Sequence, residues 1–106
     1  MTEIHITEPA EYDLINVEYA IFVDLENPQA AARIVDGILE TIEKLRLFPL
    51  QHPPVNEELL ASLGIRMTWF DNYNIFYFYE EDRDVIHVIR ILYKGADWQK
   101  LLTRFL

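Results

Sequence analysis

Two periodicities of apolar residues divide the chain into an early helical part and a later strand part. Ile4–Ile6 alternates over a short stretch and predicts a first strand. Thr7 and Pro9 then form a typical helix start, since a hydroxyl side chain caps a helix and proline is favoured in its first turn. Apolar residues follow at helical spacing and predict a helix over residues 8–25. This stripe consists of Tyr12, Ile15, Tyr19, Phe22 and Val23.

A second helix follows almost at once. Asn27-Pro28 again reads as a cap and a first helical residue, and Phe48-Pro49 stops the pattern. The predicted helix covers residues 28–46. The break between the two helices is so short that it favours a tight helical hairpin. The second stripe consists of Ala31, Ile34, Val35, Ile38, Leu39, Ile42 and Leu45.

The remaining sequence predicts mainly strands. Residues 50–58 are rich in proline and indicate an irregular connection, and residues 57–63 suit a short helical turn. Short polar breaks between the next apolar segments favour antiparallel hairpins. The predicted strands are Ile65–Phe70, Asn74–Glu80 and Val85–Leu92. A final short helix is expected over residues 97–106, with Trp98, Leu101, Leu102 and Phe105 on its apolar side.

The order of elements predicts an α+β fold made of one domain, residues 1–106. Helices and strands are segregated along the chain, which favours a helical hairpin packed on one face of a mostly antiparallel sheet. The sheet would combine the N-terminal strand with a three-stranded C-terminal meander, followed by the short C-terminal helix.

Composition and charge narrow the function classes. The 106 residues include no cysteine, so disulfide and thiol chemistry are excluded. The net charge of −9 argues against broad, nonspecific binding of nucleic acid. No apolar run is long enough for a membrane span and no signal-peptide pattern is present, so we expect a cytoplasmic protein without a membrane partner. The acidic excess lies in residues 1–53, with ten acidic and three basic residues (−7), against eight and six (−2) in residues 54–106.

Two arginines interrupt apolar strand sequence. Alternation places Arg66 on one face with Thr68 and Phe70, and Arg90 on one face with Val88. If helices cover only one side of the sheet, both arginines could lie on the open, concave side and bind phosphate. Their register is open, however, and each could instead reach water or pair with a nearby acid.

Several segments taken together resemble the RelE/ParE superfamily, the toxins of bacterial type II toxin–antitoxin pairs, which are often labelled plasmid stabilisation proteins. The resemblance covers nearly the whole chain and rests on the order and spacing of its segments. These are "ITEPAEYDL", "NPQAAARIVDGILETIEKLRLFP" and "LGIRMTWFDNYNIFYFYEEDRDVIHVIRILYKGADWQKLL". It implies a β-α-α-β-β-β core, inhibition of growth, and a cognate antitoxin protein as partner.

The resemblance leaves the toxic action open between two classes. ParE-like members bind DNA gyrase, and this is the interpretation we favour. RelE-like members are metal-independent endoribonucleases that cut mRNA on the ribosome, and a diverged toxin that only binds its antitoxin is a further alternative. For a nuclease, the resemblance implies catalytic roles for Arg66 and Arg90 as phosphate clamps and for Tyr93 as general acid or base.

Other chemistry-bearing residues are sparse. Where lysine-using nucleases carry a basic pair, this chain has Glu57 and Glu58, which could supply a base but more simply belong to an exposed helical turn. The three histidines, His5, His52 and His87, are far apart in the sequence and do not predict a zinc site. We therefore expect no metal and no cofactor.

Overall fold

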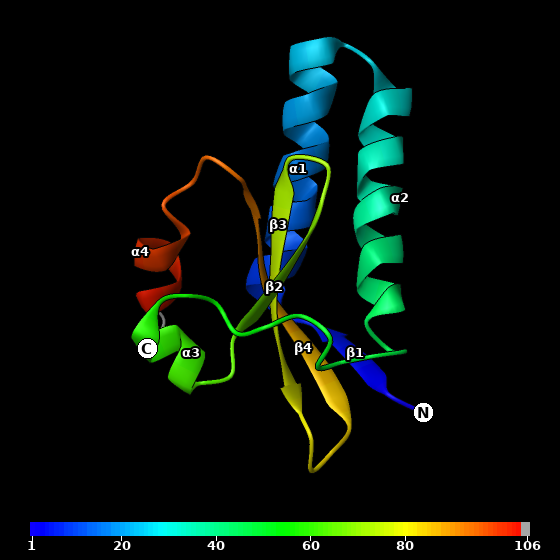
Figure 1. Ribbon diagram of the computed structural model, residues 1–106. Coiled ribbons are helices and arrows are strands. Elements are labelled where there is room, and N and C mark those ends of the chain that lie inside the picture. Colours follow the sequence, from blue (N-terminus) through cyan, green and yellow to red (C-terminus); the bar gives the residue numbers. More distant parts are fainter. Residues whose placement is uncertain (105–106) are drawn as a thin grey trace.

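The fold follows the order predicted from the sequence. The computed structural model describes residues 1–104 (Figure 1). Its elements are β1 (Glu3–Ile6), α1 (Glu8–Leu25), α2 (Pro28–Lys44), α3 (Glu58–Ser62), β2 (Arg66–Phe70), β3 (Tyr73–Glu80), β4 (Val85–Tyr93) and α4 (Trp98–Thr103). The α+β class and all the predicted elements are confirmed, and no end is shifted by more than three residues. Phe105, expected on the apolar side of the last helix, lies outside the described residues.

Side-chain caps define the helical hairpin. The Thr7 hydroxyl accepts a hydrogen bond from the Ala10 amide at the start of α1. The Asn27 side chain accepts from the amides of Gln29 and Ala30 at the start of α2. Between the helices, Glu26 has a left-handed backbone with φ of 48°, which turns the chain back within two residues. These contacts explain why the predicted break is a tight hairpin.

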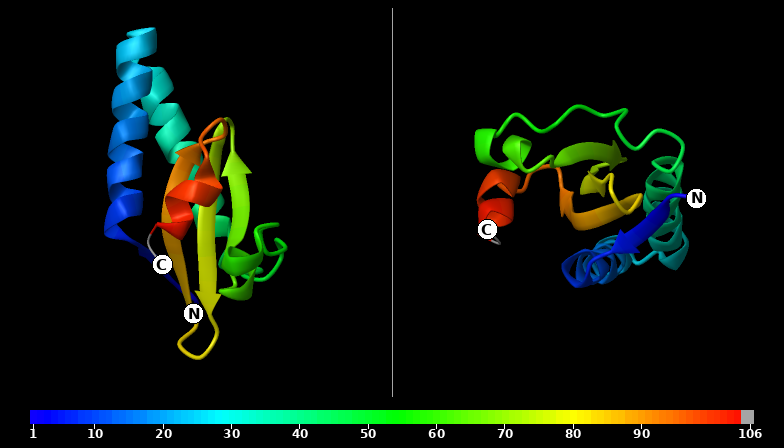
Figure 2. Two further views of the ribbon diagram at one scale, coloured as in Figure 1. Left: turned by 90° about the vertical axis from the view of Figure 1, so that its left-hand side faces the viewer. Right: turned by 90° about the horizontal axis from the view of Figure 1, so that it is seen from below.

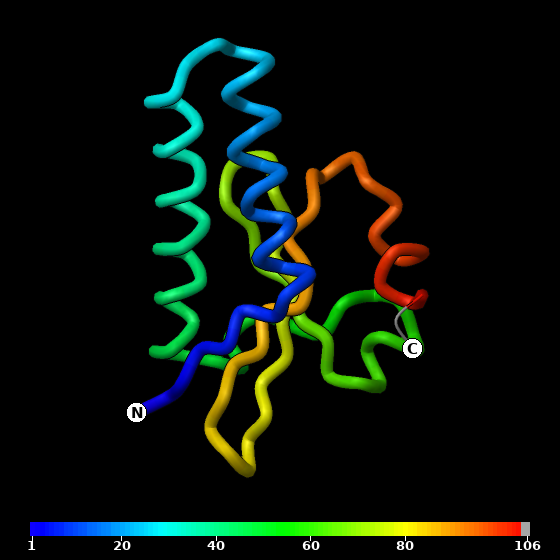
Figure 3. The backbone as a smooth tube through the Cα atoms, turned by 180° about the vertical axis from the view of Figure 1, so that it is seen from behind, coloured from blue at the N-terminus to red at the C-terminus, as the bar shows by residue number. Residues whose placement is uncertain are grey.

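The four strands form one sheet in the order β1-β4-β3-β2. β1 runs parallel to β4, and β3 pairs antiparallel with both β4 and β2. Seen from behind, α1 passes in front of the sheet and α2 stands beside α1 (Figure 3). The view from below shows α3 and α4 on the other side of the sheet from this hairpin (Figure 2). The far ends of α1 and α2 extend past the sheet (Figure 1).

Each face of the sheet carries an apolar core. The main core lies between the hairpin and the sheet and includes Val17, Ile38, Tyr77, Val88 and Ile91. The small core lies on the other face and consists of Val55, Leu60, Ile65, Phe76, Leu92 and Leu102. The second face is therefore not simply open, because α3, α4 and the proline-rich connection cover part of it.

Helix α1 does not bury the stripe that predicted it. Its buried positions are Ala10, Asp13 and Val17, with Leu14 and Ile21 partly buried. The predicted stripe is on the opposite side, where Tyr12, Ile15, Tyr19, Phe22 and Val23 are exposed. α1 has apolar residues on both sides, so the period identified a helix but not its buried face. In α2, by contrast, the predicted positions Ala31, Ile34, Ile38 and Ile42 are buried.

A close helix–sheet contact fixes α2 against β2. A Cβ added to Gly37 would lie 2.1 Å from Cζ of Phe70 and 2.2 Å from its Cε2. A side chain at position 37 would therefore overlap the aromatic ring in its present position.

Candidate functional site

A bulge in β4 places the two arginines on opposite faces of the sheet. Arg66 is paired with Tyr77, which belongs to the main core, whereas Arg90 is paired with Phe76, which belongs to the small core. The register shifts by one residue between Phe76 and Tyr77, because Tyr77 pairs with Val88 and Ile89 is the extra residue. In a regular strand, Arg90 and Val88 would share a face, as the sequence predicted. The extra residue moves Arg90 to the other side, so the expected convergence of the two arginines is not found.

Arg90 is held by a carboxylate from α1. Its Nε donates to Oδ2 of Asp13 at 2.7 Å and its Nη2 donates to Oδ1 at 2.9 Å. The two side chains are only 17% and 9% exposed. The hydrogen bond to Asp13 raises the pKa of Arg90 above its ordinary value, against the opposing effect of burial. This is a bidentate, largely buried ion pair of the kind that a phosphate would otherwise form with an arginine.

The same carboxylate completes the edge of β4 where β1 ends. Pairing of the two parallel strands finishes at Val88, whose carbonyl accepts from the Thr7 amide. The next carbonyl, of Ile89, accepts from the Thr7 hydroxyl at 3.2 Å. Beyond it, the Ile91 amide donates to Oδ2 of Asp13 at 2.9 Å. Asp13 therefore accepts the backbone hydrogen bond that a longer β1 would accept, and it binds Arg90 at the same time. These two roles explain why a helix carries a buried carboxylate.

Arg66 makes a different contact on the other face. Its Nη1 donates to the backbone carbonyl of His52 in the proline-rich connection. The neighbouring Tyr77 is fully buried, and burial raises its pKa to about 12, although the positive charge of Arg66 acts in the opposite direction. Arg66 thus ties the connection to the start of β2.

Tyr93 lies at the end of β4, away from Arg66 along the strands. It is exposed, it pairs with Tyr73, and the two rings meet edge to face with centroids 5.8 Å apart. Tyr77, the partner of Arg66, lies four residues along β3 from Tyr73, or about 13 Å at the usual rise of a strand. The structure therefore does not bring Arg66, Arg90 and Tyr93 together, and their catalytic roles stay predictions.

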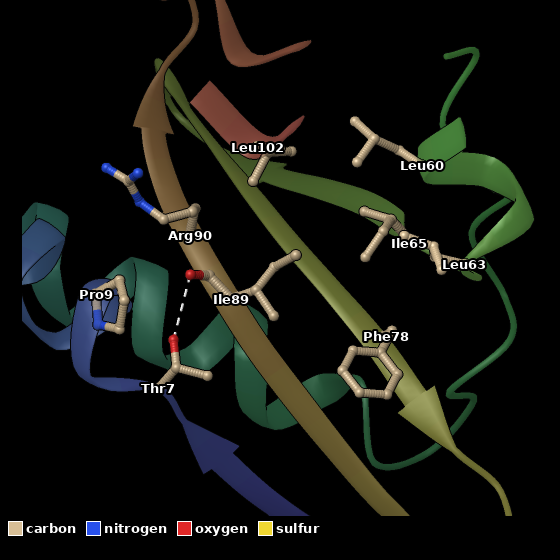
Figure 4. A pocket seen from close by; sticks show the side chains of 9 residues that line it. All are labelled: Thr7, Pro9, Leu60, Leu63, Ile65, Phe78, Ile89, Arg90 and Leu102. Carbon is tan, nitrogen blue, oxygen red and sulfur yellow. Dashed lines mark hydrogen bonds between the residues drawn. The ribbon is translucent and has the colours of Figure 1, made fainter. Parts of the chain in front are cut away.

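An apolar groove of about 550 Å³ lies on the small-core face. Figure 4 shows Ile65, Phe78 and Ile89 facing one another across it, with the guanidinium of Arg90 turned away. Such a groove suits binding of apolar side chains from a partner better than it suits acid–base chemistry. It is lined by Thr7, Pro9, Leu60, Leu63, Ile65, Phe78, Ile89, Arg90 and Leu102.

The remaining candidates have structural contacts. The Glu57 side chain accepts from the Leu60 amide at 2.7 Å and caps α3, as in the simpler of its two interpretations. Parallel pairing brings His5 beside His87, with 3.0 Å between their Nδ1 atoms, and Nε2 of His87 lies 2.9 Å from Glu80. The sequence analysis missed this histidine pair because its two members are 82 positions apart in the chain. Across residues 1–104, no group of three or more His, Cys, Asp or Glu side chains is placed to hold a metal ion.

Solved structures with the same fold are toxins and toxin–antitoxin complexes. The chromosomal ParDE toxin–antitoxin system of P. aeruginosa matches with a TM-score of 0.72 and 21% identity, over 88% of this chain and 96% of that chain. The toxin–antitoxin complex RelBE2 of Mycobacterium tuberculosis matches with a TM-score of 0.60 and 18% identity, over 90% and 93%. The isolated E. coli RelE toxin matches with a TM-score of 0.62 and 9% identity, over the full length of both chains. The fold is therefore that of the RelE/ParE toxin superfamily.

The sequence itself identifies the family within this superfamily. Residues 4–98 match the family described as the ParE toxin of the type II toxin–antitoxin system parDE. The chain belongs to this ParE toxin family. No curated protein sequence is significantly similar to it. Among the helices of residues 1–104, none is long and apolar enough to cross a membrane.

Proposed function

We propose that this protein is a cytoplasmic toxin that stops growth by binding a protein target such as DNA gyrase, and that a cognate antitoxin neutralises it. The observation that carries this proposal is the ion pair between Arg90 and Asp13. An arginine that already has a bidentate carboxylate must give it up before it can hold a phosphate. Removing one partner from a buried pair costs about 3–5 kcal/mol, which disfavours Arg90 as a phosphate clamp.

Charge supports the same choice. A nuclease that docks into ribosomal RNA needs a positive surface, and the net charge of this chain is −9. A toxin that holds a protein target requires no convergent catalytic set. The separation of Arg66 from Arg90 by the bulge is no obstacle to such a mechanism.

The groove on the small-core face is the part of the surface that suits the antitoxin. Its lining comes from the start of α1, from α3, β3, β4 and α4 and from the residues next to them, and it is almost entirely aliphatic or aromatic. An amphipathic segment of the antitoxin could insert apolar side chains between Phe78, Ile89 and Leu63. Neutralisation would then follow from covering this face.

The test is expression from an inducible promoter, with and without the adjoining reading frame that would encode the antitoxin. We expect growth arrest with induction of the DNA-damage response, relief by the neighbour, and inhibition of gyrase supercoiling by the purified protein. The RelE-like alternative predicts codon-linked mRNA cuts in primer extension, and their loss in Tyr93→Phe, an exposed position where the fold should be kept. Such cuts, or harmless expression of a diverged toxin, would overturn the proposal.

A further inference from the structure

The outer side of α1 carries an unusual apolar surface. Four large side chains follow one another at helical spacing and are 50–69% exposed. We call this surface the outer ridge; it consists of Tyr12, Ile15, Tyr19 and Phe22. Scattered exposed apolar residues are normal, but a continuous ridge with two tyrosines and a phenylalanine has the composition of an interface.

The fold does not use the outer ridge. α1 packs on β4 and α2 through its opposite side, where Ala10, Asp13 and Val17 are buried. The far part of the hairpin also extends past the sheet (Figures 1 and 2). A ridge that contributes nothing to the core yet presents large apolar side chains to water indicates a partner.

A shallow depression beside the outer ridge could receive side chains of a bound partner. It has a volume of about 390 Å³ between α1 and α2. On the α2 side its floor is made by the small residues Pro28, Ala31 and Ala32, and on the α1 side its wall is made by Tyr19 and Phe22. Small residues let a helix backbone approach closely, so large side chains from a partner helix can enter between them.

Charge restricts the partner. The first 32 residues contain no lysine or arginine. Asp13 is already paired with Arg90, but the other acids of α1 and of the residue that follows it are exposed. These acids are Glu8, Glu11, Glu18, Asp24 and Glu26. A second copy of the same ridge would bring two acidic borders together, and an anionic membrane would be repelled, so the complementary surface is apolar with basic borders.

We propose that the outer ridge of α1 binds an amphipathic helix of a partner protein whose apolar stripe is bordered by lysine or arginine. The apolar side chains of that helix would pack over Ile15 and Tyr19, and its cations would face Glu11 and Glu18. This surface is on the opposite side of the sheet from the groove assigned to the antitoxin, so a complex could engage both. The inference does not depend on gyrase being the target.

The test uses the full chain and two labelled synthetic helical peptides of 18 residues. One has leucines at heptad positions with lysine borders, and the other replaces every lysine with glutamate. We expect the lysine peptide to bind at least about tenfold more tightly than the glutamate peptide in fluorescence anisotropy. Added salt should weaken its binding, because charge pairs contribute to it. Equal binding of the two peptides would overturn the proposal.

Matched variants separate the ridge from nonspecific attraction to an acidic protein. Ile15→Ser with Tyr19→Ser keeps every charge and should weaken lysine-peptide binding at least about tenfold. Leu47→Ser with Phe48→Ser removes an equally exposed apolar pair elsewhere and should change binding less than about twofold. Glu11→Gln with Glu18→Gln should lower both the affinity and its salt dependence. Circular dichroism checks that each variant is folded.

Three further results would contradict the proposal. Wild-type affinity in the Ile15/Tyr19 variant would show that the peptide binds elsewhere. A concentration-dependent dimer in analytical ultracentrifugation that Ile15→Ser converts to monomer would assign the ridge to a second copy. Cosedimentation with vesicles of phosphatidylcholine and phosphatidylglycerol that requires Ile15 and Tyr19 would assign it to a membrane surface.

Discussion

Arg90 and Asp13 are separated by 77 positions in the sequence, yet they form a bidentate ion pair that joins β4 to α1. The pair is the reason why an arginine can occupy strand sequence with only 17% of its side chain exposed. Asp13 also accepts the Ile91 amide, so its two oxygens serve three donors. Loss of this carboxylate would remove a bidentate partner from the guanidinium and the acceptor of a buried backbone amide.

The first prediction concerns this pair. Asp13→Ala should lower the free energy of unfolding by about 3–5 kcal/mol, because it removes the carboxylate from a largely buried ion pair. Replacing both residues with apolar side chains of similar size, Asp13→Leu with Arg90→Met, should cost much less than the sum of the single changes. Urea denaturation of Asp13→Leu, of Arg90→Met and of the double variant gives the coupling free energy between the two residues. Additive losses would show that the pair contributes little.

The second prediction concerns the contact of Gly37 with Phe70. Gly37→Ala should destabilise the protein by about 1–3 kcal/mol, because the new methyl group overlaps the ring. With Phe70→Ala already present, the same change should stabilise it by about 0.5–1 kcal/mol, since alanine is the better helix former. Thermal denaturation of the wild type, Gly37→Ala, Phe70→Ala and the double variant tests whether the effect of Gly37→Ala on stability changes sign. A loss of stability in both backgrounds would place the strain within α2.

The third prediction concerns the contribution of Asp84 to stability at low pH. Hydrogen bonds from Tyr79 and then from Thr2 hold the pKa of Asp84 below its ordinary value. Because the folded pKa is depressed, the contribution to stability is complete above the unfolded pKa of about 3.9 and is lost as pH falls through the folded value. Asp84→Asn should therefore flatten the loss of stability at low pH. Its left-handed backbone, φ 55°, is one that asparagine tolerates.

Tyr79→Phe is the matched test for this acid dependence. It removes the larger of the two hydrogen bonds and should raise the pKa of Asp84 toward its ordinary value. Denaturation curves between pH 7 and pH 2 measure the effect. An unchanged acid transition in both variants would assign the sensitivity to other carboxylates.

The sequence was sufficient for the elements but not for their register. Caps such as Thr7 and Asn27 and the turn residues between strands are local signals, and they were read correctly. The extra residue Ile89 leaves no local signal, because it is one more apolar residue in an apolar run. That single residue puts Arg90 and Val88 on opposite faces, so strict alternation was wrong for that pair.

The buried side of α1 was hidden for a related reason. Leu14, Val17 and Ile21 are apolar on one side, while Tyr12, Ile15 and Tyr19 are apolar and equally periodic on the other. Periodicity cannot choose between two apolar sides, and the deciding residue, Asp13, looks like a surface acid until its partner is known. Contacts between distant parts of the chain determine both the face on which Arg90 lies and the side of α1 that is buried.

The last prediction concerns Thr7, where β1, α1 and β4 meet. Its hydroxyl accepts from the Ala10 amide and donates to the Ile89 carbonyl, so one side chain starts the helix and ends the parallel pairing. Thr7→Val keeps the shape but removes both hydrogen bonds and should cost about 1–2 kcal/mol. Thr7→Ser keeps both and should cost less than half as much. Since the start of α1 positions Asp13, amide hydrogen exchange at Ile91 should accelerate in Thr7→Val and stay near wild type in Thr7→Ser. Equal exchange rates in the two variants would show that Asp13 is held independently of this cap.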